Sequence, residues 1–200
     1  MRIFSDVGLA GASPRRPRHY SRLARGLTAA MLMLAAQLAP ARLVYAQPPP
    51  TFTQDVEARV VALVNDFRAE HGLKPLEREP RLDQTAQYFG GYMADRGTLE
   101  HTADGNTPAA RVKQRGYAYC VIAENIAYEY SSRGFTAKEL ARVFVEGWQD
   151  SATHRANMLD AAVTQTGLGV ARSGRGEYYA AQIFGRPPVP GAKKSAACRR

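Results

Sequence analysis

Apolar side chains recur at helical spacing in two stretches of the chain, and each stretch ends at a glycine. The first stretch runs to Gly72 and the second to Gly97, and glycine is typical of the residue that follows a helix. Thr107 then offers a capping hydroxyl ahead of Pro108, which predicts a short helix towards Arg115. The apolar positions of the two longer helices are Val56, Val60, Leu63, Val64 and Phe67, then Leu82, Ala86, Phe89 and Met93.

The middle of the chain changes from a strand pattern back to a helix pattern. Gly116 interrupts the preceding helix, and aromatic and β-branched residues then alternate from Tyr117, which predicts a strand that ends at Glu124. Thr136 and Glu139 form a capping box, which predicts a helix that carries Leu140, Phe144, Gly147 and Trp148. A further turn or two of helix is expected over residues 152–159.

Two final strands are predicted over residues 165–172 and 177–184, because the four residues between them suit a tight hairpin. So short a loop requires the two strands to be antiparallel. Gly167 and Gly169 lie with Ala171 on one face of the first strand, where a helix can approach closely. The order of elements predicts an α+β domain with a small sheet covered by helices on both sides.

The N-terminus has the pattern of an export leader. An arginine-rich stretch through Arg25 precedes a charge-free run over residues 26–41, which is short for a membrane span of about 20 residues. Val44 and Ala46 precede Gln47 in the spacing that a signal peptidase requires, which predicts cleavage after Ala46. We therefore expect residues 1–46 to be a signal peptide and the mature protein, without a membrane span, to be secreted or periplasmic. An uncleaved N-terminal anchor is the alternative.

The net charge of +9 over 200 residues is concentrated at the two ends of the chain. Residues 47–186 hold 16 basic and 17 acidic residues, so this part lacks the basic footprint of a nucleic-acid-binding domain. We expect an extended lead-in over residues 47–54, one folded domain over residues 55–186 and a basic tail with proline and glycine over residues 187–200. No nucleic-acid partner is expected.

The chain contains two cysteines, Cys120 and Cys198. In an oxidising compartment they can form a disulfide that joins the tail to the domain, and the alternative is two free thiols. Their spacing excludes a metal knuckle of the CxxC type.

Three histidines follow the leader, and two of them are candidates for chemistry. His71 ends a helix and is interpreted as structural, whereas His101 and His154 lie in polar segments and suit metal binding or proton transfer. Glu124 is flanked by apolar residues, so its carboxylate must be partnered or perturbed; the alternative is that it only ties loops together. Ser151 shares a helix face with His154 and invites a serine–histidine–carboxylate hypothesis, but no oxyanion loop surrounds it.

A set of short segments in a fixed order resembles the CAP superfamily of cysteine-rich secretory, antigen 5 and pathogenesis-related proteins, and above all its bacterial secreted branch. The resemblance covers about residues 55–186. The segments are Asn65-Asp-Phe-Arg68 with Gly72-Leu-Lys-Pro-Leu76, His101 with Asp104-Gly105, Gly116-Tyr117, Ala123-Glu-Asn-Ile-Ala127, Gly147-Trp148 with His154-Arg-Ala-Asn-Met-Leu159, Gly167-Leu-Gly-Val-Ala171 and Gln182-Ile-Phe-Gly185.

The resemblance implies a three-layer α-β-α sandwich with a largely antiparallel sheet and a cleft that holds two histidines and two acids. His101, Glu124 and His154 match three of these four positions, and Ser151, with Asp150 beside it, stands at the fourth. Two imidazoles and a carboxylate still suffice for zinc or another divalent metal with an open position, with His101 and His154 as the metal ligands. The residues expected to line this ligand cleft are His101, Glu124, His154, Ser151, Asn125 and Asn157.

Three functions follow from the resemblance and the residues. The leading hypothesis is an exported binding module, rather than an enzyme, for a small apolar, lipid or cell-envelope ligand, with or without a divalent metal. The first alternative is a metal-assisted, protease-like hydrolase in which zinc on His101 and His154 activates water and Glu124 is the general base. In the second alternative the polar cluster is only scaffold, and the domain binds a protein partner.

Overall fold

The structure is a computed structural model that describes residues 51–191 and Cys198. The predicted signal peptide and most of the predicted lead-in and of the basic tail after Gly191 lie outside the described residues. None of the helices described in this range combines the length and apolar character that crossing a membrane requires.

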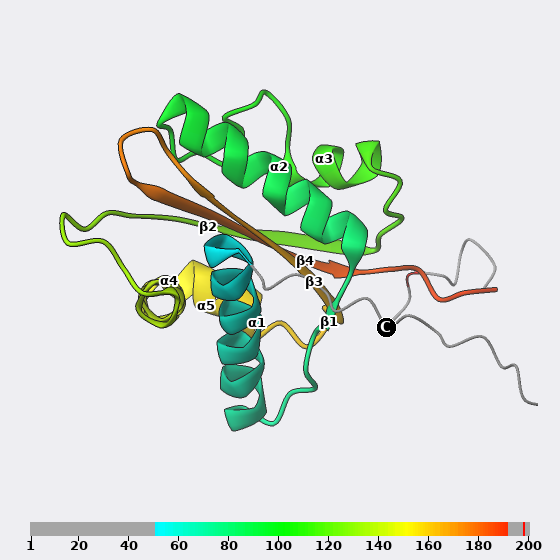
Figure 1. Ribbon diagram of the computed structural model, residues 1–200. Coiled ribbons are helices and arrows are strands. Elements are labelled where there is room, and N and C mark those ends of the chain that lie inside the picture. Colours follow the sequence, from blue (N-terminus) through cyan, green and yellow to red (C-terminus); the bar gives the residue numbers. More distant parts are fainter. Residues whose placement is uncertain (1–50, 192–197, 199–200) are drawn as a thin grey trace, which may run out of the picture. The chain divides into compact units, whose positions relative to one another are not determined.

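Five helices and four strands make up the described domain (Figure 1). In chain order they are α1 (Phe52–Glu70), β1 (Glu77–Arg78), α2 (Pro80–Arg96), α3 (Pro108–Gln114), β2 (Val121–Glu129), α4 (Ala137–Asp150), α5 (Ala152–Met158), β3 (Gln165–Arg172) and β4 (Tyr178–Arg186). The predicted helix caps are confirmed: Thr107 accepts a hydrogen bond from the Ala110 amide, and Thr136 and Glu139 form a capping box. Gly97 closes α2 in the left-handed conformation.

The sheet has the strand order β1-β3-β4-β2, in which β3–β4 and β4–β2 are antiparallel pairs and β1 is parallel to β3. The hairpin of β3 and β4 is therefore confirmed. The two-residue strand β1 has no counterpart in the predictions, because a segment so short leaves no periodic pattern.

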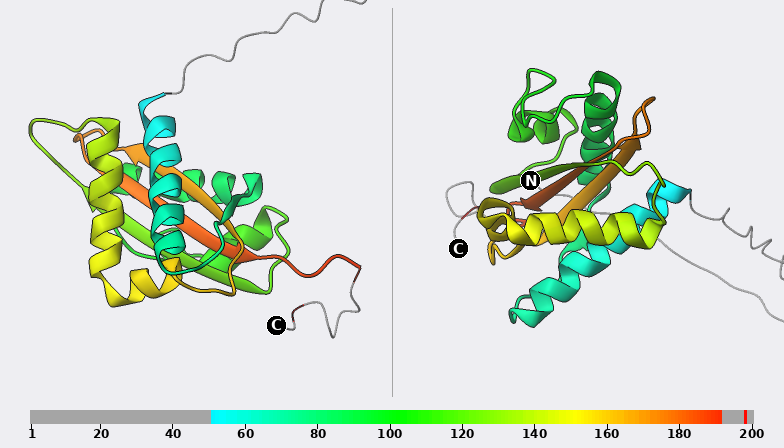
Figure 2. Two further views of the ribbon diagram at one scale, coloured as in Figure 1. Left: turned by 90° about the horizontal axis from the view of Figure 1, so that it is seen from below. Right: turned by 90° about the vertical axis from the view of Figure 1, so that its left-hand side faces the viewer.

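Helices cover both faces of the sheet, so the predicted α-β-α sandwich is confirmed. Figures 1 and 2 show α2 and α3 on one face and α1, α4 and α5 on the other. Each face has its own apolar core: Phe144, Trp148 and Leu168 belong to the first cluster, under α1 and α4, and Phe89 and Ile183 to the second, under α2.

The helix α2 packs directly against β3 at two glycines, as the sequence predicted. A Cβ atom added at Gly167 would meet the backbone of Leu82 and Asp83, and one added at Gly169 would meet the backbone of Ala86 and Gln87. Both positions therefore require glycine.

Side chains cover the outer backbone groups of β3 beyond its short pairing with β1. The Leu168 amide donates to Asp83 at 3.0 Å, and the Val170 amide donates to the buried Glu57 at 3.1 Å. Arg78 contacts both carboxylates. Burial raises the pKa of Glu57, and the hydrogen bond from Val170 opposes this shift. The free part of the strand is thus closed to a further strand.

A buried arginine connects the C-terminal end of α1 to the loop that follows it and to the end of α5. Arg68 donates to three backbone carbonyls, those of Lys74 at 2.9 Å, Met158 at 2.6 Å and Asp160 at 3.0 Å. Because none of these acceptors is a carboxylate, Arg68 serves packing and chain connection.

The prediction of a strand from Tyr117 to Glu124 is wrong in its bounds. The strand β2 begins at Val121 and continues to Glu129, so Glu124 lies near its middle. Pairing with β4 decides these bounds, because Val121 opposes Arg186 and Glu129 opposes Tyr178. At the other end of the domain, α1 begins at Phe52, three residues inside the predicted lead-in, because Thr51 and Gln54 form a capping box.

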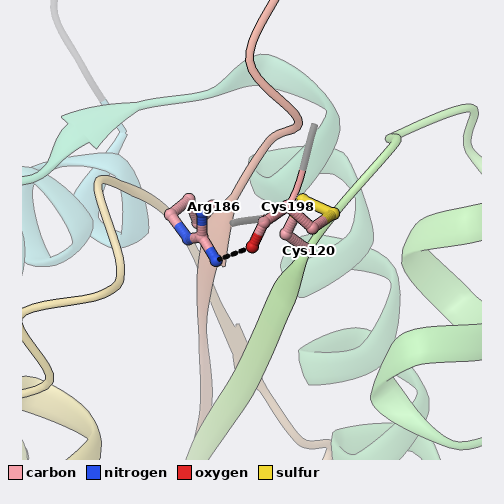
Figure 3. Close-up of a disulfide and its surroundings, with 3 residues drawn as sticks. All are labelled: Cys120, Arg186 and Cys198. Carbon is pink, nitrogen blue, oxygen red and sulfur yellow. Dashed lines mark hydrogen bonds between the residues drawn. A yellow bond between two sulfur atoms is a disulfide. The ribbon is translucent and has the colours of Figure 1, made fainter. Parts of the chain in front are cut away.

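The disulfide between Cys120 and Cys198 is present, so this alternative is confirmed over free thiols (Figure 3). Its Cα atoms are 5.2 Å apart. Arg186, at the end of β4, donates to the carbonyl of Cys198 at 3.2 Å, and its own carbonyl accepts from the Cys120 amide at 2.7 Å. The disulfide therefore joins Cys198 to the residue before β2.

Candidate functional site

A buried ion pair between Arg111 and Glu124 forms the centre of the candidate site. Arg111 extends from α3 and Glu124 from β2, and their side chains are 0% and 1% exposed. One guanidinium nitrogen of Arg111 lies 3.0 Å and 2.8 Å from the two Glu124 oxygens. Charge pairing at this depth is favourable only where most of the remaining donors and acceptors are also satisfied nearby.

Neighbouring groups on the loop before α3 accept hydrogen bonds from the two terminal nitrogens of Arg111, whereas its buried Nε has no hydrogen-bond partner among the described residues. Its second terminal nitrogen donates to Asp104 and to the carbonyl of Asn106, each at 2.8 Å. The carbonyl of His101 accepts from the first nitrogen at 3.0 Å. The guanidinium carbon lies 3.4 Å from the centroid of the Phe89 ring, so the cation is also stacked on α2. Arg111 thereby fixes the loop that carries His101.

His101 lies above this pair, with a half-exposed side chain (48%). Its Nδ1 is 2.9 Å from Glu124 Oε1. Because an ionised carboxylate only accepts hydrogen bonds, Nδ1 carries the hydrogen and a neutral His101 has its lone pair on Nε2. The arrangement is that of a carboxylate that orients an imidazole and fixes its tautomer.

His154 reaches the site from α5, on the other face of the sheet, around the edge strand β2. Glu124 and Asn125, adjacent in β2, point to opposite faces: Glu124 faces His101, and Asn125 donates to the His154 carbonyl at 3.1 Å. Asn157 donates to Asn125 Oδ1 at 2.8 Å and to the Glu124 carbonyl at 3.3 Å. Burial lowers the pKa of His154, and the nearby His101 lowers it further, so His154 favours the neutral form.

The structure therefore brings five of the six predicted cleft residues into one hydrogen-bonded and electrostatic neighbourhood: His101, Glu124, Asn125, His154 and Asn157. The sixth, Ser151, is the residue between α4 and α5. Its hydroxyl makes no hydrogen bond to His154 within residues 51–191, and Glu124 contacts His101 instead. No serine–histidine–carboxylate relay is assembled. Asp150, at the end of α4, is exposed.

The side chains of the site that remain open to a ligand or a metal are the two imidazoles, His101 and His154. Both Glu124 oxygens accept hydrogen bonds and the side chain is only 1% exposed, so little of the carboxylate is open to contact with water. Among the described residues, no group of three histidine, cysteine or acidic side chains is placed to hold a metal. A catalytic zinc takes three protein ligands, so these residues do not fit the zinc of a hydrolase.

Two important site residues, Arg111 and Asp104, were not predicted to have these roles. Asp104 was noted only as part of the family resemblance. The available signal was the position of Arg111 beside the buried Val112 on a short helix. An arginine on the inward face of a helix needs an acidic partner, and this requirement, combined with an unpartnered Glu124, would have paired the two.

A small pocket lies on the same side of β2 as Glu124. Its volume is about 270 Å³, and its lining includes Leu99, two residues before His101, and Tyr128, four residues after Glu124. Successive residues of a strand alternate between faces, so Tyr128 and Glu124 share one face. The full lining is Gly97, Leu99, Tyr128, Arg175, Glu177 and Tyr179.

The α-β-α sandwich is the fold that the sequence resemblance implied for a CAP domain. The family model of the cysteine-rich secretory proteins (CAP) matches residues 61–184, which is more than half of the chain. The chain belongs to this family, and the resemblance noted in the sequence is confirmed.

Individual relatives are distant. The uncharacterized protein YkwD of Bacillus subtilis is 29% identical over 126 residues, which are 62% of this chain and 46% of that protein. The chain thus spans less than half the length of this relative.

Two solved structures show the same fold. An outer surface protein of Borrelia burgdorferi superposes with a TM-score of 0.60 at 16% identity, covering 71% of this chain and 99% of that one. An extracellular protein of Bacillus anthracis that contains an SCP domain gives a TM-score of 0.57 at 23% identity, covering 72% of this chain and 46% of that one.

Proposed function

We propose that the protein is an exported binding module in which His101 and His154 contact the polar group of a small apolar, lipid or cell-envelope ligand. The observation that carries the proposal is the engagement of Glu124, whose two oxygens accept hydrogen bonds from Arg111 and His101. A carboxylate held in this way orients an imidazole and is itself buried from solvent. The half-exposed imidazole then offers a hydrogen-bond acceptor at the surface.

The pocket beside Leu99 and Tyr128 supports the apolar part of this proposal. It opens on the side of β2 from which Glu124 supports His101, and its walls include three apolar or aromatic side chains, Leu99, Tyr128 and Tyr179. Small-molecule sites commonly combine such apolar walls with a few fixed polar groups. A ligand with a short apolar portion can place that portion here and its polar group against the histidines.

Export is supported by two properties of the chain and one of a relative. The leader pattern at the N-terminus predicts secretion, and the disulfide suits an oxidising compartment. The similar Bacillus anthracis protein is described as extracellular. We propose that the mature protein is secreted or periplasmic.

Native mass spectrometry of the protein purified from its own envelope or medium tests the proposal. We expect a bound small-molecule mass on the wild type and its loss from the His101→Ala, His154→Ala double variant. His71→Ala is the matched control, because His71 is an exposed histidine whose Nδ1 bonds to the Phe67 carbonyl at the end of α1. The control is expected to retain the bound mass.

Addition of zinc separates the alternatives. One zinc ion on the wild type and none on the double variant would support a divalent metal between the imidazoles. A chelator-sensitive hydrolase activity that Glu124→Gln suppresses would replace the binding proposal with the hydrolase. Wild type that carries no ligand and binds neither lipid nor envelope fragments would leave the cluster as scaffold.

A further inference from the structure

The outward face of α2 carries two tyrosines between two arginines, which we call the tyrosine–arginine ladder (Tyr88, Tyr92, Arg96 and Arg115). Tyr88, Tyr92 and Arg96 follow one another at intervals of four residues, so they lie along one stripe of the helix. The ring centroids of Tyr88 and Tyr92 are 6.4 Å apart. Arg96 lies 5.6 Å from the Tyr92 centroid, and Arg115, from the end of α3, lies 4.4 Å from that of Tyr88.

The ladder contributes to neither apolar core. The opposite face of α2 supplies Leu82, Phe89 and Met93 to the core against the sheet, whereas Tyr88 is 43% exposed. Figure 1 shows α2 lying across the sheet with its outer side uncovered by any other described helix. Tyr88 and Tyr92 therefore form an aromatic pair on the surface that belongs to neither core cluster.

The arginines of the ladder have no acidic partners. Neither Arg96 nor Arg115 forms an ion pair with any residue in the described part of the chain, and the same holds for Arg81 and Lys113 nearby. Asp95 is the one exposed acid on α2. By contrast, Arg59, Arg78, Arg133, Arg142 and Arg175 each contact a carboxylate. This face therefore keeps an uncompensated positive charge although residues 47–186 are close to neutral.

We propose that the tyrosine–arginine ladder binds an acidic polysaccharide. Pyranose rings present flat faces of C–H groups that pack on tyrosine, and guanidinium groups stacked on those rings keep their N–H edges free for carboxylates. A linear polymer of acidic sugars repeats both features, as the ladder does.

The same surface is less suited to the other anionic polymers. A nucleic-acid site needs a broad basic footprint because every nucleotide carries a charge, and here four basic residues surround a single stripe. An anionic membrane surface is bound by helices with projecting aliphatic or aromatic side chains over an extended apolar face. The ladder offers two hydroxyl-bearing rings and no aliphatic side chain along its stripe.

Binding of the purified full chain to polygalacturonate, measured by isothermal titration calorimetry, tests the proposal. We expect binding that weakens as salt rises, because the carboxylates contribute through charge. The Tyr88→Ala, Tyr92→Ala variant should bind about tenfold or more weakly, since it loses both stacking contacts. The Arg96→Gln, Arg115→Gln variant should bind more weakly and with less dependence on salt. All four residues lie at the surface, so these variants are expected to fold.

Matched controls distinguish the ladder from general charge and aromaticity. Tyr130→Ala removes a tyrosine that is 55% exposed, and Arg133→Gln removes an exposed arginine; both should bind as the wild type does. Neutral dextran and polyglutamate should bind at least about tenfold more weakly than polygalacturonate, since each lacks one of the two recognised features. Equal binding of polyglutamate, stronger binding of poly(dT) or of anionic vesicles, or an undiminished affinity of the tyrosine variant would each overturn the proposal.

Discussion

Each face of the sheet buries one arginine, and the two arginines have different partners. Arg68, under α1, donates only to backbone carbonyls and connects pieces of chain. Arg111, under α2 and α3, pairs with Glu124 and Asp104 and, through Glu124, fixes the surface imidazole of His101. A buried charge that satisfies backbone groups stabilises a fold, whereas one that pairs with side chains also sets what the surface presents. The charged groups that hold His101 therefore lie on one side of β2, whereas His154 and much of the apolar core lie on the other.

Removal of Arg111 should have the largest effect. Arg111→Met leaves two buried carboxylates without a cation, so we expect a loss of about 3–5 kcal/mol in the free energy of unfolding, measured by urea denaturation. Adding Glu124→Gln should recover part of the loss, because the amide buries no charge. A loss below about 1 kcal/mol, as is usual for an exposed ion pair, would contradict the assigned burial.

Removal of Arg68 should cost less and should leave the site unchanged. Arg68→Met deprives three carbonyls of their donor, and since the hydrogen bonds to Lys74 and Asp160 are only partly buried, we expect a loss of about 2–3 kcal/mol. The NMR signals of the His101 ring should not move. If they move as much as in Arg111→Met, the two arginines do not have the separate roles described.

The close contact between α2 and β3 predicts an intermediate effect. Gly169→Ala forces a methyl group against the backbone of Ala86 and Gln87, which should cost about 1–3 kcal/mol. Gly91→Ala is the matched control in the same helix, because nothing lies within 4 Å of its added Cβ. That variant should gain about 0.5–1 kcal/mol. Thermal unfolding of the two variants distinguishes the effect of the contact between α2 and β3 from the effect of helix propensity.

Two helix caps allow the same change to be made on each face. Thr136→Ala on α4 and Thr107→Ala on α3 each remove a capping hydroxyl and should cost about 1 kcal/mol. Only Thr107→Ala should also shift the His101 ring signals, because α3 carries Arg111. Equal responses of His101 to the two variants would show that α3 does not position the site.

The smallest expected effect is a pH dependence from His154. Its pKa in the folded chain lies below the ordinary value of 6.5, so the unfolded chain binds protons more readily. The stability that this group contributes is fully present above pH 6.5 and is lost as the pH falls through the lowered pKa. His154→Asn should flatten the stability profile below pH 6.5, measured by urea unfolding from pH 5 to pH 8. A steeper profile in the variant would reverse the assigned sign.

The fold was largely predictable from local patterns. The caps at Thr107 and Thr136, the glycine contacts at Gly167 and Gly169, and the β3–β4 hairpin all follow from rules that act over a few residues. The bounds of β2 were not predictable in this way, since pairing with β4 decides where the strand begins and ends.

The candidate site was predictable in its residues but only partly in its chemistry. The sequence indicated His101 and His154 because they lie in polar segments, and Glu124 because it has apolar neighbours. The structure brings the three residues to one edge of the sheet. The engagement of Glu124 depends on Arg111, which is thirteen positions earlier in the chain. A partner at that separation becomes visible only when α3 is packed beside β2.

The tautomer of His101 tests the central claim most directly, because the claim is that Glu124 holds this imidazole. A long-range ¹H–¹⁵N NMR spectrum of the histidine rings at pH 8 measures it, with the Glu124→Gln variant as the comparison. We expect a protonated Nδ1 and an unprotonated Nε2 on His101, with this preference lost in Glu124→Gln. A His101 ring protonated on Nε2 in the wild type would contradict it.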